Sequence, residues 1–222
     1  MSEQDQIMKT LMPYFQTEKD NKLRSFRQRN RYVKPGQILF TGSSLMEQFP
    51  ICEFCATEGL PLVYNRGIGG YTTDEFLEAI DVMLLDLKPS KVFINIGTND
   101  IRAMENGEDW FVHLSKNYRR ILEIARRELP DAIIYMMAYY PVNRNHPRAR
   151  QNPAIATRTN ENVNRANRMV EALAAEFGCR YIDVNDGIKD AEGNLLLDHT
   201  VDGVHMDPEA YRAVFERLRP YI

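Results

Sequence analysis

Two short segments of this chain carry side chains whose types and spacing could do chemistry. In residues 37–46 a short apolar run, 38–40, is followed by Gly42, two serines and a stretch that suits a helix. This pattern predicts a strand, a tight turn and a helix start. Ser44 would then lie at the carboxyl end of a strand, beside free N–H groups that can stabilise an anion. A serine nucleophile needs such stabilisation in its transition state. A plain helix N-cap is the alternative role for Ser44.

The second segment lies near the end of the chain, where Asp202 and His205 stand three residues apart. They directly precede a well-marked helix start, because Asp207 is a good N-cap and Pro208 suits the first helical position. In such a loop a carboxylate can reach one imidazole nitrogen while the other nitrogen faces a serine. Polar residues on a solvated loop are the alternative interpretation.

The elements around these segments alternate regularly between strand and helix. Five apolar runs are expected to be strands, at residues 38–40, 62–64, 91–97, 132–140 and 180–184. Five amphipathic stretches are expected to be helices, at about 2–30, from 72 onward, 108–128, 157–177 and 208–218. This alternation predicts an α/β fold with a parallel sheet covered on both faces. The ligand crevice of such folds lies beyond the carboxyl ends of the strands.

Three turns that follow strands therefore converge at one edge of the predicted sheet. They contain Ser44, Gly70 and Asn99, and Asp202 and His205 complete the set. Ser44 would attack an ester carbonyl, with His205 moving the proton and Asp202 orienting the imidazole. The N–H groups of Ser44 and Gly70 and the Asn99 amide could hold the oxyanion. The G-x-S-x-G turn of α/β-hydrolases is absent, since residue 46 is Met.

Four segments in this order resemble the sequence blocks of the SGNH hydrolases, also called GDSL-like esterases. They are residues 42–45 (Gly-Ser-Ser-Leu), 65–70 (Asn-Arg-Gly-Ile-Gly-Gly), 97–100 (Gly-Thr-Asn-Asp) and 202–205 (Asp-Gly-Val-His). The resemblance spans roughly residues 36–222. It implies a flavodoxin-like three-layer α/β/α sandwich with five parallel strands, no metal or other cofactor, and hydrolysis of esters that often carry short acyl chains.

Carried over residue by residue, the resemblance assigns Ser44 as nucleophile and Asp202 and His205 as its triad partners. It also assigns Gly70 and Asn99 to the oxyanion hole. The spacing of the blocks is most similar to the branch related to platelet-activating-factor acetylhydrolase subunits, which implies a small acyl group such as acetyl.

Two positions depart from the family pattern, and a polar loop adds candidate substrate contacts. Ser43 stands where the family usually has Asp, and Tyr71 replaces a polar residue after the Gly-Gly pair. Both are expected at the pocket floor, where Tyr71 would narrow the acyl pocket. Arg148 and Arg150 lie on the loop 141–156, and loops of this length over a crevice often contact substrate.

Other residues permit alternative functions. Asp and His can bind hard or borderline metals, so a metal-dependent hydrolase could use Asp100, Asp198, His199, Asp202 and His205. That interpretation leaves the serine turn and the glycine loop without roles. A non-catalytic carbohydrate- or lipid-binding module on the same fold is a second alternative. The pair 198–199 could also replace the pair 202–205, but the closing helix cap favours the latter.

The remaining candidate residues are expected to be structural. Cys52 and Cys55 form a Cys-x-x-Cys pair without a second ligand pair, and Cys179 stands alone. His113 is expected to be a partly exposed packing residue of a helix.

Composition and charge define the broad class. The 222 residues, 44% hydrophobic, suit one domain at 35–222 with a helical extension at 1–34 packed on it. Acidic and basic residues are mixed, with a net charge of −3, so no nucleic-acid partner is expected. No run approaches the roughly 20 apolar residues of a membrane span. Without a signal peptide and with three cysteines, a cytoplasmic location is expected.

The expected partner is a small-molecule ester: an acetylated sugar, a lysophospholipid or an aryl ester. A homo-oligomer formed through the basic N-terminal helix is a further possibility.

Overall fold

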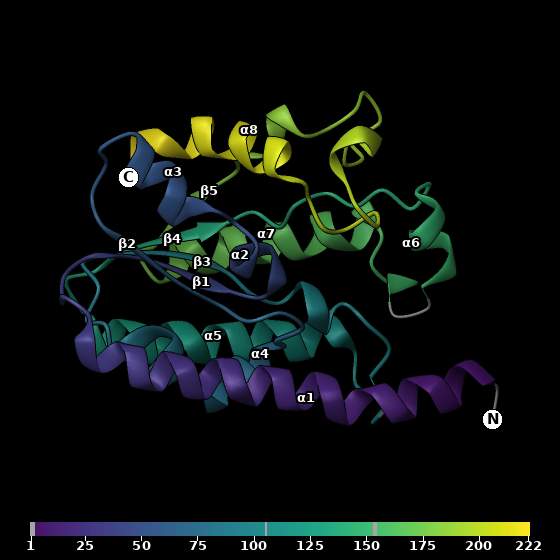
Figure 1. Cartoon of the computed structure of the whole chain (residues 1–222), viewed down its shortest axis with the longest axis horizontal. Helices are drawn as coiled ribbons and strands as arrows, with labels where there is room; N and C mark the ends of the chain where they lie inside the picture. Colours follow the sequence, from purple (N-terminus) through teal and green to yellow (C-terminus); the bar gives the residue numbers. More distant parts are fainter. Residues whose placement is uncertain (1–2, 105, 153–154) are drawn as a thin grey trace.

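The computed structural model describes residues 3–104, 106–152 and 155–222, and its centre is a five-stranded parallel sheet (Figure 1). The strands are β1 (Ile38–Gly42), β2 (Val63–Gly67), β3 (Lys91–Asn95), β4 (Ile133–Met137) and β5 (Arg180–Ile182). Their order across the sheet is β2-β1-β3-β4-β5, and each neighbouring pair is parallel. The predicted parallel sheet is confirmed.

Helices cover both faces of this sheet, so the fold has three layers (Figure 1). One face packs against α1 (Glu3–Arg29), α4 (Thr73–Glu78), α5 (Trp110–Glu128) and α7 (Asn160–Glu176). The other face packs against α2 (Ser44–Glu47), α3 (Ile51–Thr57) and α8 (Pro208–Leu218). Alternate strand residues supply the two cores, because successive side chains point to opposite faces. Leu39 and Val92 belong to the first core, while Phe40 and Phe93 stack in the second with ring centroids 4.5 Å apart.

Capping residues define where the helices near the sheet's carboxyl edge begin. The Thr72 hydroxyl accepts a hydrogen bond from the Glu75 N–H, and the Glu75 carboxylate accepts one from the Thr72 N–H. This reciprocal pair of hydrogen bonds is a capping box. At α8 the Asp207 carboxylate accepts a hydrogen bond from the Ala210 N–H at 2.8 Å, and Pro208 occupies the first turn. The loops before both helices are thereby held in place.

Three regions differ from the sequence-based expectations. The helix expected from 72 onward ends at Glu78, and a π-helical segment, Asp81–Leu85, follows it. The loop 141–156 contains a short helix, α6 (Pro147–Gln151), and its residues 153–154 lie outside the described residues. Helix α3 was not expected, because a seven-residue helix is stabilised by packing of its apolar side rather than by local propensity.

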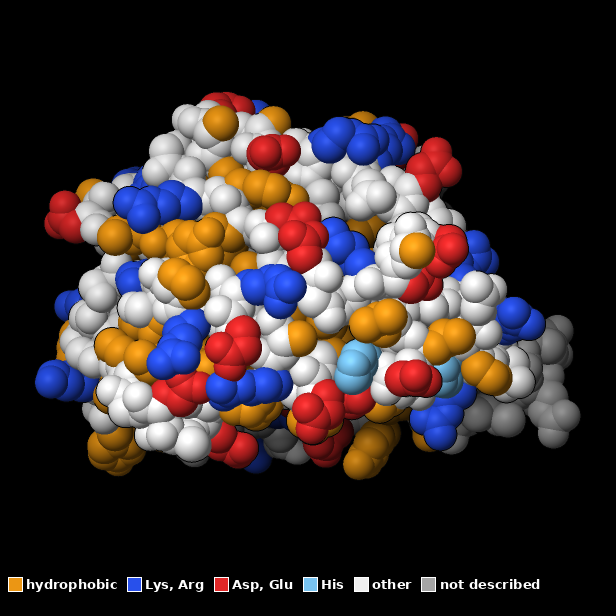
Figure 2. All heavy atoms as spheres, turned by 90° about the horizontal axis from the view of Figure 1, so that it is seen from above, with side chains coloured by type: hydrophobic (Ala, Val, Ile, Leu, Met, Phe, Trp, Pro, Cys, Tyr) orange, Lys and Arg blue, Asp and Glu red, His pale blue; other side chains and the backbone are white. Residues whose placement is uncertain are grey.

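The surface carries both signs of charge. On the face shown in Figure 2, Lys and Arg side chains are interspersed with Asp and Glu, as the net charge of −3 suggests. Within the described ranges, no helix is long and apolar enough to cross a membrane.

Candidate active site

Ser44 lies at the turn between β1 and α2, as the sequence predicts. Gly42 has φ +149°, and a Cβ there would come within 1.9 Å of the Asn95 carbonyl oxygen, so only glycine fits this turn. The half-buried Ser44 is the first residue of α2. Its neighbour Ser43 is buried, and the Ser43 hydroxyl has no hydrogen-bond partner among the described atoms.

The loop before α8 brings His205 and Asp202 to this serine. His205 Nε2 lies 2.9 Å from Ser44 Oγ, and His205 Nδ1 lies 2.6 Å from Asp202 Oδ2. Asp202 Oδ1 accepts hydrogen bonds from the backbone N–H groups of Val204 and His205, at 2.9 and 2.8 Å. The three side chains, from two distant segments, therefore form one hydrogen-bonded chain.

The protonation of Asp202 follows from these contacts. Burial alone would raise the pKa of the carboxyl, but the hydrogen bonds from the His205 side chain and the loop N–H groups outweigh it. The pKa of Asp202 is therefore held well below its usual value. An ionised Asp202 keeps the proton of a neutral His205 on Nδ1, which leaves the Nε2 lone pair directed at the Ser44 hydroxyl.

Three residues with hydrogen-bond donors line the same cavity. Ser44 and Gly70 have backbone N–H groups that donate to no atom of the described residues. Asn99 Nδ2 donates to the Tyr71 carbonyl at 2.9 Å, and an amide NH₂ has a second N–H to offer. Ser44, Gly70, Asn99 and His205 all line one cavity of about 430 Å³. The arrangement is able to bind an oxyanion beside an activated hydroxyl.

Arg158 is a residue of this cavity that sequence reasoning missed. Its side chain is buried, its Nη2 donates to Asn99 Oδ1 at 3.0 Å, and its Nε has no partner among the described residues. Burial lowers the pKa of the guanidinium to about 10, although the charges of Asp100 and Asp202 oppose the shift. Nothing in the local sequence distinguishes Arg158 from the chain's other arginines.

Helix α1 also lines the cavity, through Phe15, Glu18, Lys19 and Lys22. The sequence pattern suggested only an extension or a subunit contact for this helix. Its role here could not be found from periodicity, because the lysines lie on a solvated helical face and meet the site only in the folded protein.

The structure does not bring the other predicted substrate contacts into this cavity. Arg148 and Arg150 are exposed; Arg148 Nη1 donates to the Val201 carbonyl at 3.3 Å, and Arg150 Nη2 donates to Asn145 Oδ1 at 3.4 Å. Tyr71 is buried, and its ring centroid lies 5.6 Å from Lys19 Nζ. Among the described residues that line the cavity, none of these three side chains occurs.

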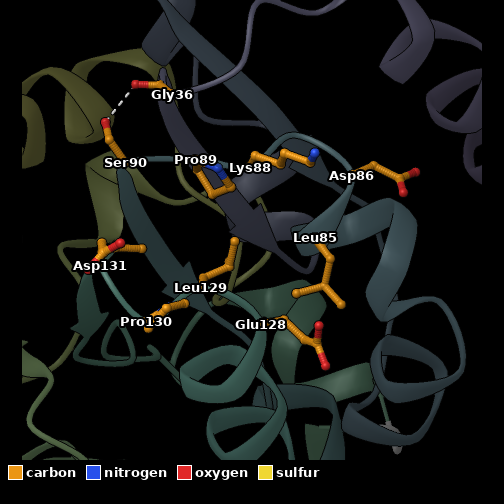
Figure 3. Close-up of a pocket in the computed structure, with 11 residues that line it drawn as sticks. Gly36, Leu85, Asp86, Lys88, Pro89, Ser90, Glu128, Leu129, Pro130 and Asp131 are labelled. Atoms are coloured by element: carbon orange, nitrogen blue, oxygen red, sulfur yellow. Dashed lines mark hydrogen bonds between the residues drawn. The ribbon is translucent and has the colours of Figure 1, made fainter.

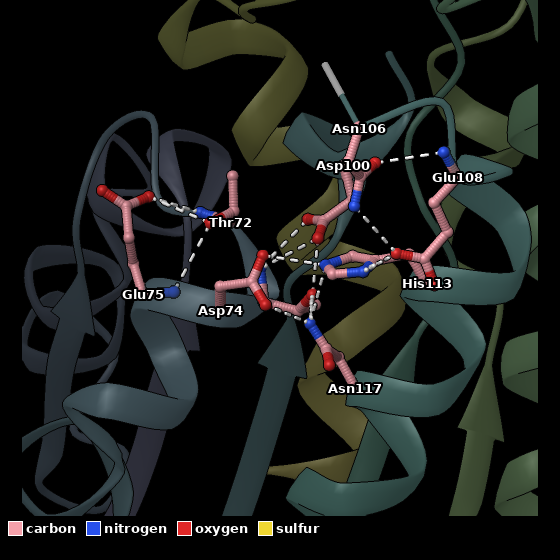
Figure 4. Close-up of polar contacts among 9 residues, drawn as sticks. Thr72, Asp74, Glu75, Asp100, Asn106, Glu108, His113 and Asn117 are labelled. Atoms are coloured by element: carbon pink, nitrogen blue, oxygen red, sulfur yellow. Dashed lines mark hydrogen bonds and ion pairs between the residues drawn. The ribbon is translucent and has the colours of Figure 1, made fainter. Parts of the chain in front are cut away.

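The residues considered as metal ligands lie in different parts of the structure. Asp100 lies with Asp74 and His113, and one possible ligand atom from each lies within 4.8 Å of the others (Figure 4). His199 instead pairs with Asp207, with Nδ1 3.3 Å from Oδ2. The five candidate ligands therefore do not form one site.

The cluster around Asp100 is occupied by its own hydrogen bonds (Figure 4). Asp100 accepts bonds from the Thr73 N–H and hydroxyl, and burial raises the pKa of its carboxyl to about 6 against the effect of those bonds. His113 Nε2 lies 2.8 Å from Asp74 and its Nδ1 lies 3.1 Å from Glu108. His113 thus joins α5 to α4 and to the preceding loop, a more specific role than the expected packing.

A second cavity, of about 620 Å³, lies at the amino ends of the strands, on the side of the sheet away from Ser44 (Figure 3). It is lined by residues that precede β1, β3 and β4, among them Gly36, Ser90 and Asp131. The Ser90 hydroxyl donates to the Gly36 carbonyl at 2.6 Å. Neither Ser44 nor His205 lines this cavity.

Comparison with known proteins identifies the family to which the chain belongs. The model of the GDSL-like Lipase/Acylhydrolase family matches residues 52–213, a stretch that includes Gly70, Asn99, Asp202 and His205. The chain belongs to the GDSL-like lipase/acylhydrolase family. This member of the family is therefore an ester hydrolase, and the resemblance seen in the four sequence blocks is confirmed.

Solved structures share this fold. A protein from Streptococcus pneumonia, provisionally described as a platelet activating factor, is 28% identical, with a TM-score of 0.86 and 98% of each chain covered. A catalytic mutant of Axe2, an acetylxylan esterase from Geobacillus stearothermophilus, shares the fold at 16% identity. Its TM-score is 0.62, with 84% of this chain and 94% of that chain covered.

One curated relative is a longer protein. N-acylneuraminate cytidylyltransferase from Escherichia coli O18:K1:H7 (strain RS218 / NMEC) is 26% identical over 190 residues. The alignment covers 82% of this chain but spans only 39% of that protein.

Proposed function

We propose that this ester hydrolase works through an acyl-enzyme on Ser44, with His205 as general base and acid and Asp202 as its orienting carboxylate. The observation that carries the proposal is the hydrogen-bonded chain itself, 2.9 Å from Ser44 Oγ to His205 Nε2 and 2.6 Å from His205 Nδ1 to Asp202 Oδ2. Such distances suit proton transfer during nucleophilic attack.

The proposed reaction has two halves. Ser44 Oγ bonds to the ester carbonyl carbon while its proton moves to His205 Nε2, and the alcohol leaves with that proton. Water then gives a proton to His205 and attacks the acyl-enzyme, which releases the carboxylic acid and restores Ser44. The N–H groups of Ser44 and Gly70 and the free N–H of Asn99 would stabilise each tetrahedral oxyanion, and losing one such donor costs about 3–4 kcal/mol.

The proposed substrate is a short-chain ester, with acetyl as the acyl group, on a polar alcohol. The cavity lining includes the polar side chains of Glu18 and Gln48, which suit a hydroxylated alcohol better than an alkyl chain. The fold shared with an acetylxylan esterase is in keeping with an acetylated sugar. Lysophospholipids and aryl esters are the other candidates.

Hydrolysis of 4-nitrophenyl acetate by the wild type and Ser44→Ala, with and without a chelator, tests the mechanism. The expected result is chelator-resistant turnover that Ser44→Ala abolishes. Turnover that survives Ser44→Ala and is lost with chelator would instead support a metal-dependent hydrolase. Absence of turnover, together with failure of a serine-directed phosphonate to label Ser44, would support a binding module without catalysis.

A further inference from the structure

Helix α1 holds the loop that carries Gly70 through a lysine. Lys19 Nζ donates to the Gly70 carbonyl at 3.0 Å and lies 2.6 Å from Glu75 Oε1. Glu75 in turn closes the capping box at Thr72. The side chains of Lys19 and Glu75 are only 19% and 26% exposed, so this ion pair is partly shielded from solvent. Lys19 therefore ties α1 to both the loop and the start of α4.

A second lysine of α1 reaches the same loop through Glu47. Lys22 Nζ lies 2.5 Å from Glu47 Oε1, and Glu47 Oε2 accepts a hydrogen bond from the Gly69 N–H at 2.5 Å. Glu47 lies one helical turn after Ser44 on α2. Gly67 permits this approach, because a Cβ there would lie 2.2 Å from the Glu47 backbone nitrogen.

These contacts hold the two peptide groups that flank the peptide carrying the Gly70 N–H. The Gly70 N–H belongs to the peptide between Gly69 and Gly70. The preceding peptide is held by its N–H on Glu47, and the following peptide is held by its C=O on Lys19. The next carbonyl along, that of Tyr71, accepts the hydrogen bond from Asn99. The direction of the Gly70 N–H is thus set by side chains that depend on α1.

We infer that α1 is part of the active site, and that Lys19 and the Lys22–Glu47 pair are positioning residues that aim the Gly70 N–H at the oxyanion. This inference rests on the proposed serine mechanism. Preorganised donors lose much of their effect when they are misplaced, and a displacement of about 1 Å can cost about 100-fold in rate.

Other contacts keep α1 on the protein independently of Lys19. Phe26 is buried in the core, and Arg66 Nε donates to the side chain of Asn30, directly after α1, at 2.9 Å. Asn30 Nδ2 donates to the Val82 carbonyl at 2.9 Å. Because these contacts lie at the carboxyl end of the helix, replacing Lys19 should leave α1 docked and change mainly the loop.

The test is steady-state hydrolysis of 4-nitrophenyl acetate by the full chain and by Lys19→Met, with thermal unfolding measured in parallel. The expected result is a kcat lowered by about 10- to 100-fold, with KM within about threefold and Tm close to that of the wild type. Lys19→Arg keeps a charged donor and should recover part of kcat. Arg27→Met, which removes an exposed cation of the same helix, is the matched control and should match the wild type.

A second variant, Glu47→Met, removes the other anchor and is expected to show the same fall in kcat at unchanged KM. Unchanged kcat in Lys19→Met would overturn the inference, as would a change in KM alone, which would make Lys19 a substrate contact. If Lys19→Met does not fold, Glu47→Met decides by the same criteria. Inactivity of the wild type itself would refute the proposed function rather than the role of α1.

Discussion

At the scale of single residues, the Asn99 amide depends on Arg158. The guanidinium donates to Asn99 Oδ1 at 3.0 Å, while Asn99 Nδ2 donates to the Tyr71 carbonyl. These two bonds fix the orientation of the Asn99 amide, and its second N–H stays free for a ligand in the cavity. A charge-assisted hydrogen bond of this kind contributes about 1.5–3 kcal/mol.

Arg158→Met should therefore lower kcat by about 10- to 100-fold, because 1.4 kcal/mol is a factor of ten and the Asn99 amide loses its orientation. Kinetics on 4-nitrophenyl acetate measure the effect, with KM expected to change little. Arg168→Met, at an exposed position of α7, is the control. A kcat equal to that of the wild type would show that Asn99 needs no support from Arg158.

Asp202→Asn should lower kcat by about 10⁴-fold, because the imidazole then takes the wrong tautomer.

The stability that Asp202 contributes to the folded protein depends on pH. Its folded-state pKa is depressed, so the contribution is present above the unfolded pKa, about 3.9, and is lost as pH falls through the folded value. Unfolding of both proteins between pH 7 and 2 measures this. A stability difference that persists unchanged in acid would contradict the assignment.

At the scale of elements, α4 and α5 are joined by a histidine. His113 on α5 pairs with Asp74 on α4 and with Glu108, and Asn117 of α5 also donates to Asp74 at 2.7 Å. Burial opposes protonation of His113, but its two carboxylate partners outweigh it and raise its pKa. The same pairing holds the pKa of Asp74 below its usual value despite burial.

His113→Gln should consequently destabilise the protein more at pH 6 than at pH 9. The folded-state pKa of His113 is raised, so its ion pair stabilises the protein fully below the pKa of the unfolded state, about 6.5. This stabilisation is lost as pH rises through the folded-state pKa. The pair is partly exposed, with Asp74 at 49%, so a loss of about 1 kcal/mol or less is expected, or about 2–4 °C in Tm.

Thermal unfolding at the two pH values gives the measurement. The double variant His113→Gln/Asp74→Asn should lose less than the sum of the losses of the two single variants, because both changes remove the same His113–Asp74 ion pair. Additive losses, or an equal loss at both pH values, would contradict the ion pair.

At the scale of the whole molecule, the cavity is formed by segments from most of the chain. It is bounded by α1, the start of α2, the Gly69–Gly70 turn, Asn99, Arg158 and the loop before α8. Phe15 is the large apolar side chain among the described lining residues. An extended alkyl chain therefore gains little apolar contact here.

Rates on 4-nitrophenyl esters should thus fall steeply from acetyl to octanoyl. Each buried CH₂ can contribute about 0.8 kcal/mol in an apolar pocket, but Phe15 is the one large apolar side chain among the described lining residues and the cavity holds only about 430 Å³. We expect kcat/KM to fall at least about tenfold along the series. A flat profile would contradict a short-chain acyl site.

Local sequence patterns predict the order of the main strands and helices along the chain, and they identify the segments that supply Ser44, Gly70, Asn99 and the Asp202–His205 loop. These features are local: an apolar run that ends in Gly42 predicts a turn, and Asp207-Pro208 predicts a helix start. The parallel sheet then follows, because strand–helix alternation brings all carboxyl ends to one edge.

The other side chains that meet at the carboxyl edge of the sheet are determined by long-range packing. Lys19 contacts Gly70, 51 residues away, and Arg158 contacts Asn99, 59 residues away. Both belong to stretches whose local pattern predicts only helix or loop, while Arg148 and Arg150, with the same chemistry, point to other partners. Long-range contacts depend on how helices pack on the sheet, and hydrophobic periodicity indicates the buried face of a helix but not the partners of its polar side chains.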